Sequence, residues 1–196
     1  MRLRCGRPVS GWPSPEKKTV LYRERNEQAR LQFQEELESL EPESLVYLDE
    51  SGVDASLHRP YGRAPRGTKV MGEVCGTRAH RISLIAALND SHLLAPMRFE
   101  GYCDTQVFNT WLEQVLLPEL KPGQTVIMDN ASFHKSSKTQ HLITSKGCTL
   151  KYLPTYSPDL NPIEHHWAIL KARLRKVMAP LQSLEQALDE TLMVYQ

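Results

Sequence analysis

Two short runs of mainly apolar residues, each followed directly by an acid, constrain the fold of this 196-residue chain more than any other feature. Residues 45–48 lead into Asp49, and residues 125–128 lead into Asp129. Runs of this length between turn-forming residues are typical of strands buried on both faces, which occur in sheets that helices cover on both sides. The pattern therefore predicts a helix-covered sheet in which two strands end at an acid.

The other segments alternate between helical and strand patterns. We expect further strands over residues 81–88, 93–99 and 149–153, and helices over residues 16–40, 105–120, 136–146, 162–177 and 181–194. This order predicts a mixed α/β fold. Residues 1–15, which are rich in proline and glycine, are interpreted as a basic arm or linker remnant, and residues 16–196 as one domain.

The last long helix is expected to present an acid near its start. Ile163, Trp167 and the later apolar residues of this segment recur at helical spacing, so they should face the core. Asn161 is expected to cap the helix, with Pro162 at the first helical position. Glu164 should then emerge in the first turn, at the edge of the buried face.

Asp49, Asp129 and Glu164 can converge at one edge of such a sheet, where ligands of open α/β sheets bind. Three carboxylates in one place repel one another unless cations neutralise them. Hard oxygen ligands select Mg²⁺ or Mn²⁺, and the four cysteines form no CxxC pair that would indicate zinc. Taken singly, each acid has another interpretation, since Asp often begins a turn and Glu164 stands where a capping-box Glu would stand.

Distinctive strings surround the three acids, namely residues 46–52 (VYLDESG), 127–135 (IMDNASFHK) and 156–167 (YSPDLNPIEHHW). They resemble the three signatures of the mariner-like DDE transposases, specifically the bacterial branch typified by insertion sequence 630. Asp129 and Glu164 are separated by 34 residues, a spacing typical of that superfamily. The resemblance runs from about residue 17 to about residue 178, and the third string is its most specific part.

The resemblance implies an RNase H-like fold, a five-stranded mixed sheet flanked by helices, whose neighbouring first and fourth strands juxtapose Asp49 and Asp129. It also implies a DNA transposase that hydrolyses phosphodiesters and transfers strands at insertion-sequence ends with two metal ions. One ion would activate water, or later a DNA 3′-hydroxyl, and the other would stabilise the leaving oxygen. Asp49 would bridge the ions, and Asp129 and Glu164 would each complete one coordination sphere.

Polar neighbours of the acids are further candidates for supporting roles, and they are Asn130, His134, Lys135 and Asn161. His134 and Lys135 are close enough to Asp129 to touch a scissile phosphate, and Asn130 could orient water, although such residues also form turns. Asp159 is expected to shape the proline-containing loop. His165 and His166 are adjacent on a helix and point in different directions, so they do not indicate zinc.

Basic residues are segregated, although the net charge is only +1. Residues 58–81, named here the basic loop, hold six Lys/Arg and one Glu among glycines and prolines. The residues expected to bind DNA are Arg59, Arg63, Arg66 and Lys69 of this loop, with Lys171 and Arg175 of the last long helix. The alternative is that these charges form an ordinary solvated surface.

Full-length relatives carry N-terminal helix-turn-helix modules, for which the stretch before Asp49 leaves no room. We therefore expect a truncated copy, an excised catalytic domain or one product of a split transposase, with a homodimer or a separate helix-turn-helix product as candidate partners. A regulatory DNA-binding fragment and a free-standing RNase H-like nuclease are the rival functions. Without a signal peptide or an apolar run of ~20 residues, a cytoplasmic location and no membrane partner are expected.

Neutralising Arg63, Arg66 and Lys69 together should weaken binding to all DNA sequences similarly. It should also reduce the slope of log affinity against log salt concentration by up to about three units. The reason is that a protein with fewer phosphate contacts releases fewer counterions when it binds DNA. Anisotropy titrations at several salt concentrations measure both quantities, and cleavage should survive at low salt. Unchanged affinity and slope would identify the basic loop as a solvated surface.

Overall fold

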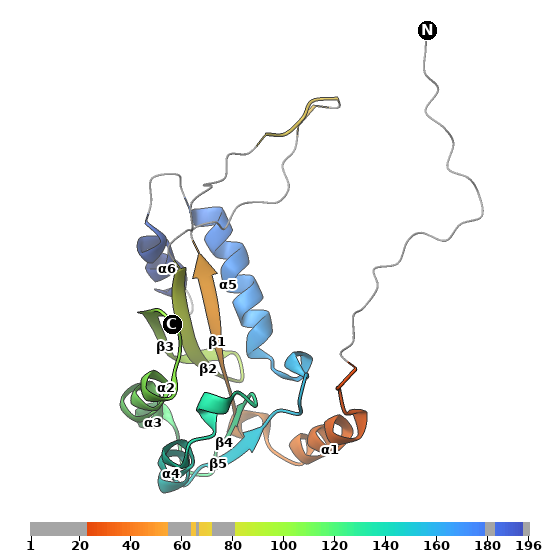
Figure 1. The fold of residues 1–196 in the computed structure, drawn as a ribbon, viewed down its shortest axis with the longest axis vertical. Coiled ribbons are helices and arrows are strands. Elements are labelled where there is room, and N and C mark those ends of the chain that lie inside the picture. Colours follow the sequence, from red (N-terminus) through yellow and green to blue (C-terminus); the bar gives the residue numbers. More distant parts are fainter. Residues whose placement is uncertain (1–22, 55–63, 66, 72–80, 179–182, 194–196) are drawn as a thin grey trace, which may run out of the picture.

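The computed structural model describes residues 23–54, 64–65, 67–71, 81–178 and 183–193. These residues include one sheet flanked by helices (Figure 1). The strands are β1 (Leu45–Asp54), β2 (Arg81–Asn89), β3 (His92–Glu100), β4 (Thr125–Met128) and β5 (Thr149–Tyr152). The helices are α1 (Glu27–Glu38), α2 (Thr105–Trp111), α3 (Leu117–Glu119), α4 (Ser137–Ser145), α5 (Ile163–Val177) and α6 (Leu184–Met193). A π-helical turn, Leu112–Leu116, joins α2 to α3, and 3-10 turns span Pro42–Ser44, Ser132–His134 and Pro158–Leu160.

The five strands lie in the order β3-β2-β1-β4-β5, so the first and fourth strands are neighbours, as the resemblance implied. β2 pairs antiparallel with both β1 and β3, whereas the β1–β4 and β4–β5 pairs are parallel. The expected hairpin at residues 81–99 is confirmed as β2 and β3. The sheet is therefore mixed, as expected.

The expected strand end at Asp49 is wrong, because β1 continues to Asp54 and pairs with β2 throughout. On the other side of β1, pairing with β4 stops where Tyr47 lies opposite Ile127. Asp49 and Asp129 each follow two positions after a member of that last pair. The parallel register therefore brings the two acids to the same level of the sheet. They lie where β4 has ended and β1 continues without a partner on that side in the described sheet.

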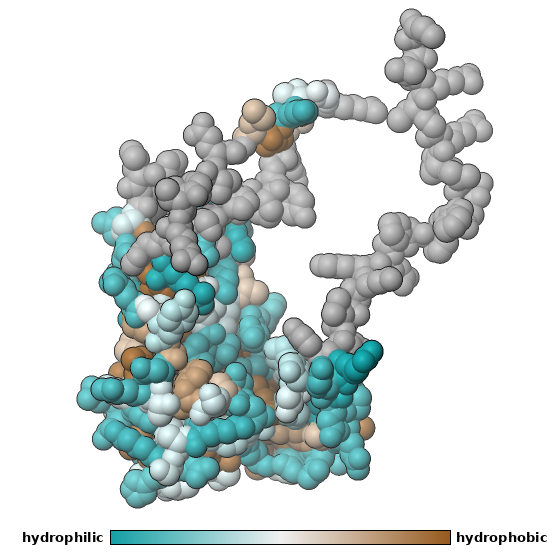
Figure 2. Space-filling view, in the orientation of Figure 1, coloured by the Kyte–Doolittle hydropathy of each residue, from teal (hydrophilic) through white to brown (hydrophobic). Residues whose placement is uncertain are grey.

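Side chains of β1 alternate between two cores. Val46 and Leu48 pack beneath α2, the π-helical turn and α4, whereas Tyr47 and Val53 face the core formed with α5 and α6. The apolar stripe expected on α5 is buried, except that Val177, at the end of the helix, is 44% exposed. On the face of the molecule shown in Figure 2, hydrophobic residues reach the surface only in separate small patches.

None of the helices in the described ranges combines the length and the apolar character needed to cross a bilayer.

Helix α1 begins later than expected within the described part of the chain. Residues 23–26 are not helical, and the Asn26 side chain caps the helix by accepting a hydrogen bond from the Ala29 N–H at 3.1 Å. Residues 16–22 of the expected helix lie outside the described residues. Phe33 of α1 is buried against Leu45 and Ile127, so the helix covers the β1–β4 junction.

A partly buried ion pair joins α1 to the loop that precedes α5. The Arg30 guanidinium donates to both carboxylate oxygens of Asp159, at 3.1 and 2.6 Å. Arg30 is 5% exposed, whereas about half of the Asp159 side chain is in contact with solvent. Asp159 therefore anchors the loop before α5, as expected, and its partner holds that loop against α1.

Asp159→Asn should lower the free energy of unfolding by about 1–2 kcal/mol, because the buried Arg30 guanidinium loses its carboxylate partner. Urea unfolding measures the difference. Glu27→Gln is the matched control, since Glu27 is exposed and lies 3.6 Å from the same guanidinium. We expect this control to change stability by less than about 0.5 kcal/mol, and equal effects of the two variants would contradict the assignment.

The same ion pair should contribute to acid unfolding. Hydrogen bonds from Arg30 hold the pKa of Asp159 below its ordinary value. Because the folded-state pKa is lowered, the stabilisation is complete above the unfolded-state pKa and is lost as the pH falls through the folded-state pKa. Asp159→Asn should therefore lose less stability than the wild type below about pH 4, and parallel pH profiles would count against this.

Candidate active site

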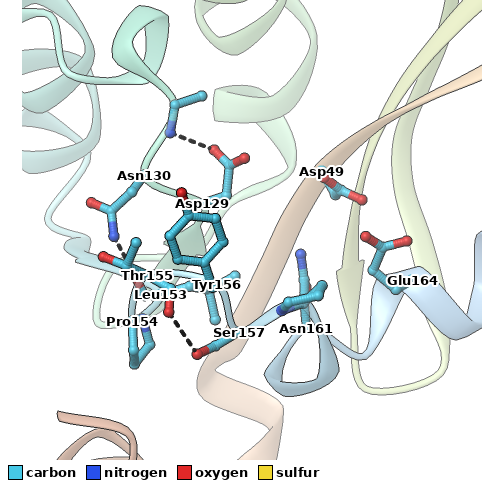
Figure 3. A pocket seen from close by; sticks show the side chains of 12 residues that line it. Asp49, Asp129, Asn130, Leu153, Pro154, Thr155, Tyr156, Ser157, Asn161 and Glu164 are labelled. Atoms are coloured by element: carbon cyan, nitrogen blue, oxygen red, sulfur yellow. Dashed lines mark hydrogen bonds between the residues drawn. The ribbon is translucent and has the colours of Figure 1, made fainter. Parts of the chain in front are cut away.

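Asp49, Asp129 and Glu164 line one open cavity beside the gap between β1 and β4 (Figure 3). The rest of the described lining comes from residues 130–131 after β4 and from the segment 153–161 between β5 and α5. In Figure 3 the carboxylates of Asp49 and Glu164 point toward one another, and Asp129 lies farther across the cavity. The structure therefore brings together the three acids singled out in the sequence.

Asp49 is held by the core beneath α5. The indole Nε1–H of Trp167 donates to Asp49 Oδ2 at 3.0 Å, and Trp167 itself is 3% exposed. Burial, followed by the negative charges of Glu164 and Glu50, raises the pKa of Asp49 to about 8. A cation bound beside Asp49 would reverse this effect, because it would favour the charged carboxylate.

Asp129 is held by groups that follow it in the chain. Its Oδ1 accepts hydrogen bonds from the Ala131 N–H at 2.9 Å and from Nδ1 of His134 at 2.7 Å. Burial alone would raise the pKa of Asp129, but these hydrogen bonds and the His134 charge outweigh it and hold the pKa below its ordinary value. Asp129 is therefore kept ionised, in contrast to Asp49.

The expected capping role of Asn161 is wrong. No side-chain hydrogen bond caps α5, and the residue before the helix is Pro162. The Asn161 side chain turns toward β1 instead, where its Nδ2 donates to the Leu48 carbonyl at 3.5 Å. This contact ties the start of α5 to β1 and so places Glu164, in the first turn of α5, beside Asp49.

The cavity offers oxygen ligands suited to a divalent cation. Besides the three carboxylates, Asn161 lines the cavity, and its buried Oδ1 has no hydrogen-bond partner among the described residues. Carboxylate and amide oxygens are the ligands that Mg²⁺ and Mn²⁺ prefer. No three carboxylate, imidazole or thiol groups in the described ranges converge tightly enough to hold a single ion. The types of oxygen donor in this cavity therefore suit a hard divalent cation.

The polar neighbours of the acids have separate roles. His134 contacts Asp129 directly, and Asn130 hydrogen bonds through Nδ2 to the Leu153 carbonyl at the end of β5. The Lys135 ammonium lies 5.7 Å from the centre of the Tyr152 ring, and Lys135 is not part of the described cavity lining. The structure thus places His134 against Asp129, and it places Asn130 and Asn161 in the lining of the cavity.

The expected DNA-binding residues are only partly described. Arg59, Arg63 and Arg66 lie outside the described residues, and Lys69 is exposed. Lys171 and Arg175 are half-buried on α5, seven and eleven positions after Glu164. At 3.6 residues per turn these spacings place both cations on the helix face that begins with Glu164.

Sequence patterns missed three residues of the site. Trp167 was expected to be core only, yet its indole also holds Asp49. Glu50 accepts a hydrogen bond from His134 Nε2 at 2.9 Å, a contact that no local spacing could reveal. Tyr156 lines the cavity with a left-handed backbone (φ 55°) and a side chain that is 45% exposed. Non-glycine residues with such strain cluster at functional sites, but only the folded backbone reveals them.

Known proteins with the same fold share this arrangement of elements. The catalytic domain of Mos1 mariner transposase superposes with a TM-score of 0.62 at 13% identity, over 92% of this chain and 85% of that one. The Mos1 mariner paired-end complexes with Mn and with Mg give TM-scores of 0.72 and 0.71 at 12% and 16% identity. These matches cover 94% and 92% of this chain but 60% and 59% of those chains. The RNase H-like fold is thereby confirmed.

Sequence comparison agrees with the fold. The chain is 29% identical over 125 residues to the transposable element Tcb1 transposase of Caenorhabditis briggsae, a match that covers 60% of this chain and 46% of that protein. The chain thus spans less than half the length of this relative. A family model described as DDE superfamily endonuclease matches residues 44–187, which include all three acids. The chain belongs to the DDE superfamily endonuclease family.

Proposed function

We propose that this chain is the catalytic domain of a DNA transposase, in which Asp49, Asp129 and Glu164 direct metal-dependent phosphodiester hydrolysis and strand transfer at insertion-sequence ends. The observation that supports this most strongly is the placement of all three acids around one cavity in a member of the DDE superfamily. In this proposal the catalytic domain covers residues 16–196, and residues 1–15 are a basic arm or a linker remnant.

Two Mg²⁺ or Mn²⁺ ions are the proposed cofactors. Asp49 and Glu164 would hold one ion and Asp49 and Asp129 the other, an assignment supported by the facing carboxylates of Asp49 and Glu164 and by the position of Asp129 in the lining of the same cavity. The ions would activate the attacking hydroxyl and stabilise the leaving oxygen of an in-line displacement. Trp167 fixes Asp49 through Oδ2, and His134 fixes Asp129 through Oδ1, so the remaining oxygens are available as ligands.

The protein groups act by positioning, because the chemistry itself is a simple displacement at phosphorus. In hydrolysis, a bond forms from water oxygen to phosphorus while the bond to the leaving strand oxygen breaks. In strand transfer, a DNA 3′-hydroxyl takes the place of water. No covalent intermediate with the protein is required, and the sequential use of one cavity explains why a single set of acids serves both steps.

DNA is proposed to approach along α5. Lys171 and Arg175 share the helix face that starts at Glu164, so they would contact phosphates beyond the scissile one. Lys69, Arg59, Arg63 and Arg66 of the basic loop would add further contacts with DNA phosphates. The proposed partners are a second copy of this chain, in a homodimer, and a separate helix-turn-helix product that would recognise the element ends.

Cleavage and joining by the purified chain distinguish the candidate functions. Labelled duplexes that carry the two ends of the insertion sequence are incubated with the chain and Mg²⁺, and they should be nicked and then joined to a target plasmid. The assay is run with the chain alone and with the chain plus any product encoded upstream. Nicking without joining under both conditions would identify a nuclease. DNA binding without nicking in Mg²⁺ or Mn²⁺ would identify a regulatory fragment.

Asp129→Ala should reduce cleavage by about 10³-fold or more, since it removes several kcal/mol of transition-state stabilisation supplied through the cations. DNA affinity should stay the same or rise slightly, because loss of a negative charge eases the approach of phosphate. Single-turnover cleavage and anisotropy titrations measure the two effects.

Glu119→Gln is the matched control, because Glu119 is exposed at the end of α3 and is not part of the described cavity lining. It should cleave at the wild-type rate. Turnover by Asp129→Ala within about tenfold of the control would rule out the assigned role.

A further inference from the structure

A continuous chain of side-chain contacts runs from β1 to Asp129 through a buried histidine. His134 Nε2 lies 2.9 Å from Glu50 Oε1, and His134 Nδ1 lies 2.7 Å from Asp129 Oδ1. Glu50 follows Asp49 in β1, so its side chain leaves the opposite face of the sheet, where Val46 and Leu48 pack. The chain of contacts therefore links the two faces of the sheet at the end of β4.

The imidazole ring of His134 cannot reorient easily. His134 is fully buried, and its ring lies 4.4 Å from the ring centre of Phe108 and 4.2 Å from that of Phe133. Each ring nitrogen meets a carboxylate oxygen, which can only accept a hydrogen bond once ionised. Both nitrogens therefore act as donors when both carboxylates are charged, and the ring is fixed between two acceptors.

The orientation of the Asp129 carboxylate depends on the His134 contact, whereas Asp49 is held by other parts of the fold. Asp49 lies within a strand that is paired with β2 and is further held by Trp167. Asp129 instead follows the last residue of β4 and has no strand partner at its own position in the described sheet. Its carboxylate can rotate unless His134 and the Ala131 N–H hold Oδ1.

We propose that Glu50 is a positioning residue that acts through His134 to fix the Asp129 carboxylate in the orientation that binds a divalent cation. The proposal rests on the proposed function, because it takes Asp129 to be a metal ligand. Glu50 orients the imidazole, the imidazole holds Asp129 Oδ1, and Asp129 Oδ2 is left for the cation. Partners of this kind, one step removed from the metal, typically change metal affinity or activity 10–100-fold when they are lost.

Binding of Mn²⁺ to the full chain without DNA, followed by electron paramagnetic resonance, tests this positioning role. Glu50→Ala should weaken binding about tenfold. Glu50→Gln should recover most of the affinity, because its amide oxygen still accepts from His134 Nε2. Glu119→Gln should bind as the wild type does. Urea unfolding of each variant separates loss of metal from loss of fold.

A double-mutant cycle distinguishes positioning from a direct effect of the Glu50 charge. His134→Phe keeps an aromatic ring between Phe108 and Phe133 but removes both donors, and it should also weaken Mn²⁺ binding about tenfold. In that background, Glu50→Ala should cost less than a further ~2-fold, since its route to Asp129 is already broken.

Two results would overturn the inference: unchanged Mn²⁺ affinity in Glu50→Ala, or a full additional loss when Glu50→Ala is combined with His134→Phe. Mn²⁺ binding by Asp49→Asn distinguishes failure of the positioning role from failure of the proposed function. If Asp49→Asn weakens Mn²⁺ binding but Glu50→Ala does not, the metal site stands and the positioning role falls. If neither variant changes Mn²⁺ binding, the metal site itself is wrong.

Discussion

Parallel hydrogen bonding between β1 and β4 joins two segments that are distant in the sequence, and the site depends on their register. The last pair, Tyr47 opposite Ile127, sets Asp49 and Asp129 at the same level. A shift of one residue would turn one acid to the other face of the sheet, because side chains alternate along a strand. The buried residues on both sides of β1 prevent such a shift, so the packing of two cores fixes the position of the acids.

The three acids are placed by different parts of the fold, and this separation shapes their electrostatics. Asp49 is in a buried strand with a raised pKa, Asp129 follows a strand and accepts two hydrogen bonds, and Glu164 is exposed in the first turn of α5. Bringing negative charges into one cavity is unfavourable for the folded protein alone. Cations would remove that cost, so metal binding and the geometry of the acids are expected to stabilise each other.

Local sequence patterns predicted most elements and the convergence of the acids, because apolar periodicity reports which faces are buried. They failed where tertiary contacts decide the outcome. β1 extends beyond Asp49 because β2 supplies a partner, and the Asn161 side chain leaves the helix end to reach the Leu48 carbonyl. Glu50 gave no signal at all, since its partner His134 is distant in the sequence. Family resemblance supplied the strand order, which the order of elements alone did not determine.

The most direct test of the proposed metal-dependent active site is anomalous diffraction from crystals of the chain soaked in Mn²⁺. The account predicts anomalous peaks within coordination distance of Asp49, one of them shared with Glu164 and the other with Asp129. Both peaks should disappear in crystals of Asp49→Asn. Manganese bound elsewhere in well-ordered crystals, with none at these carboxylates, would contradict the account.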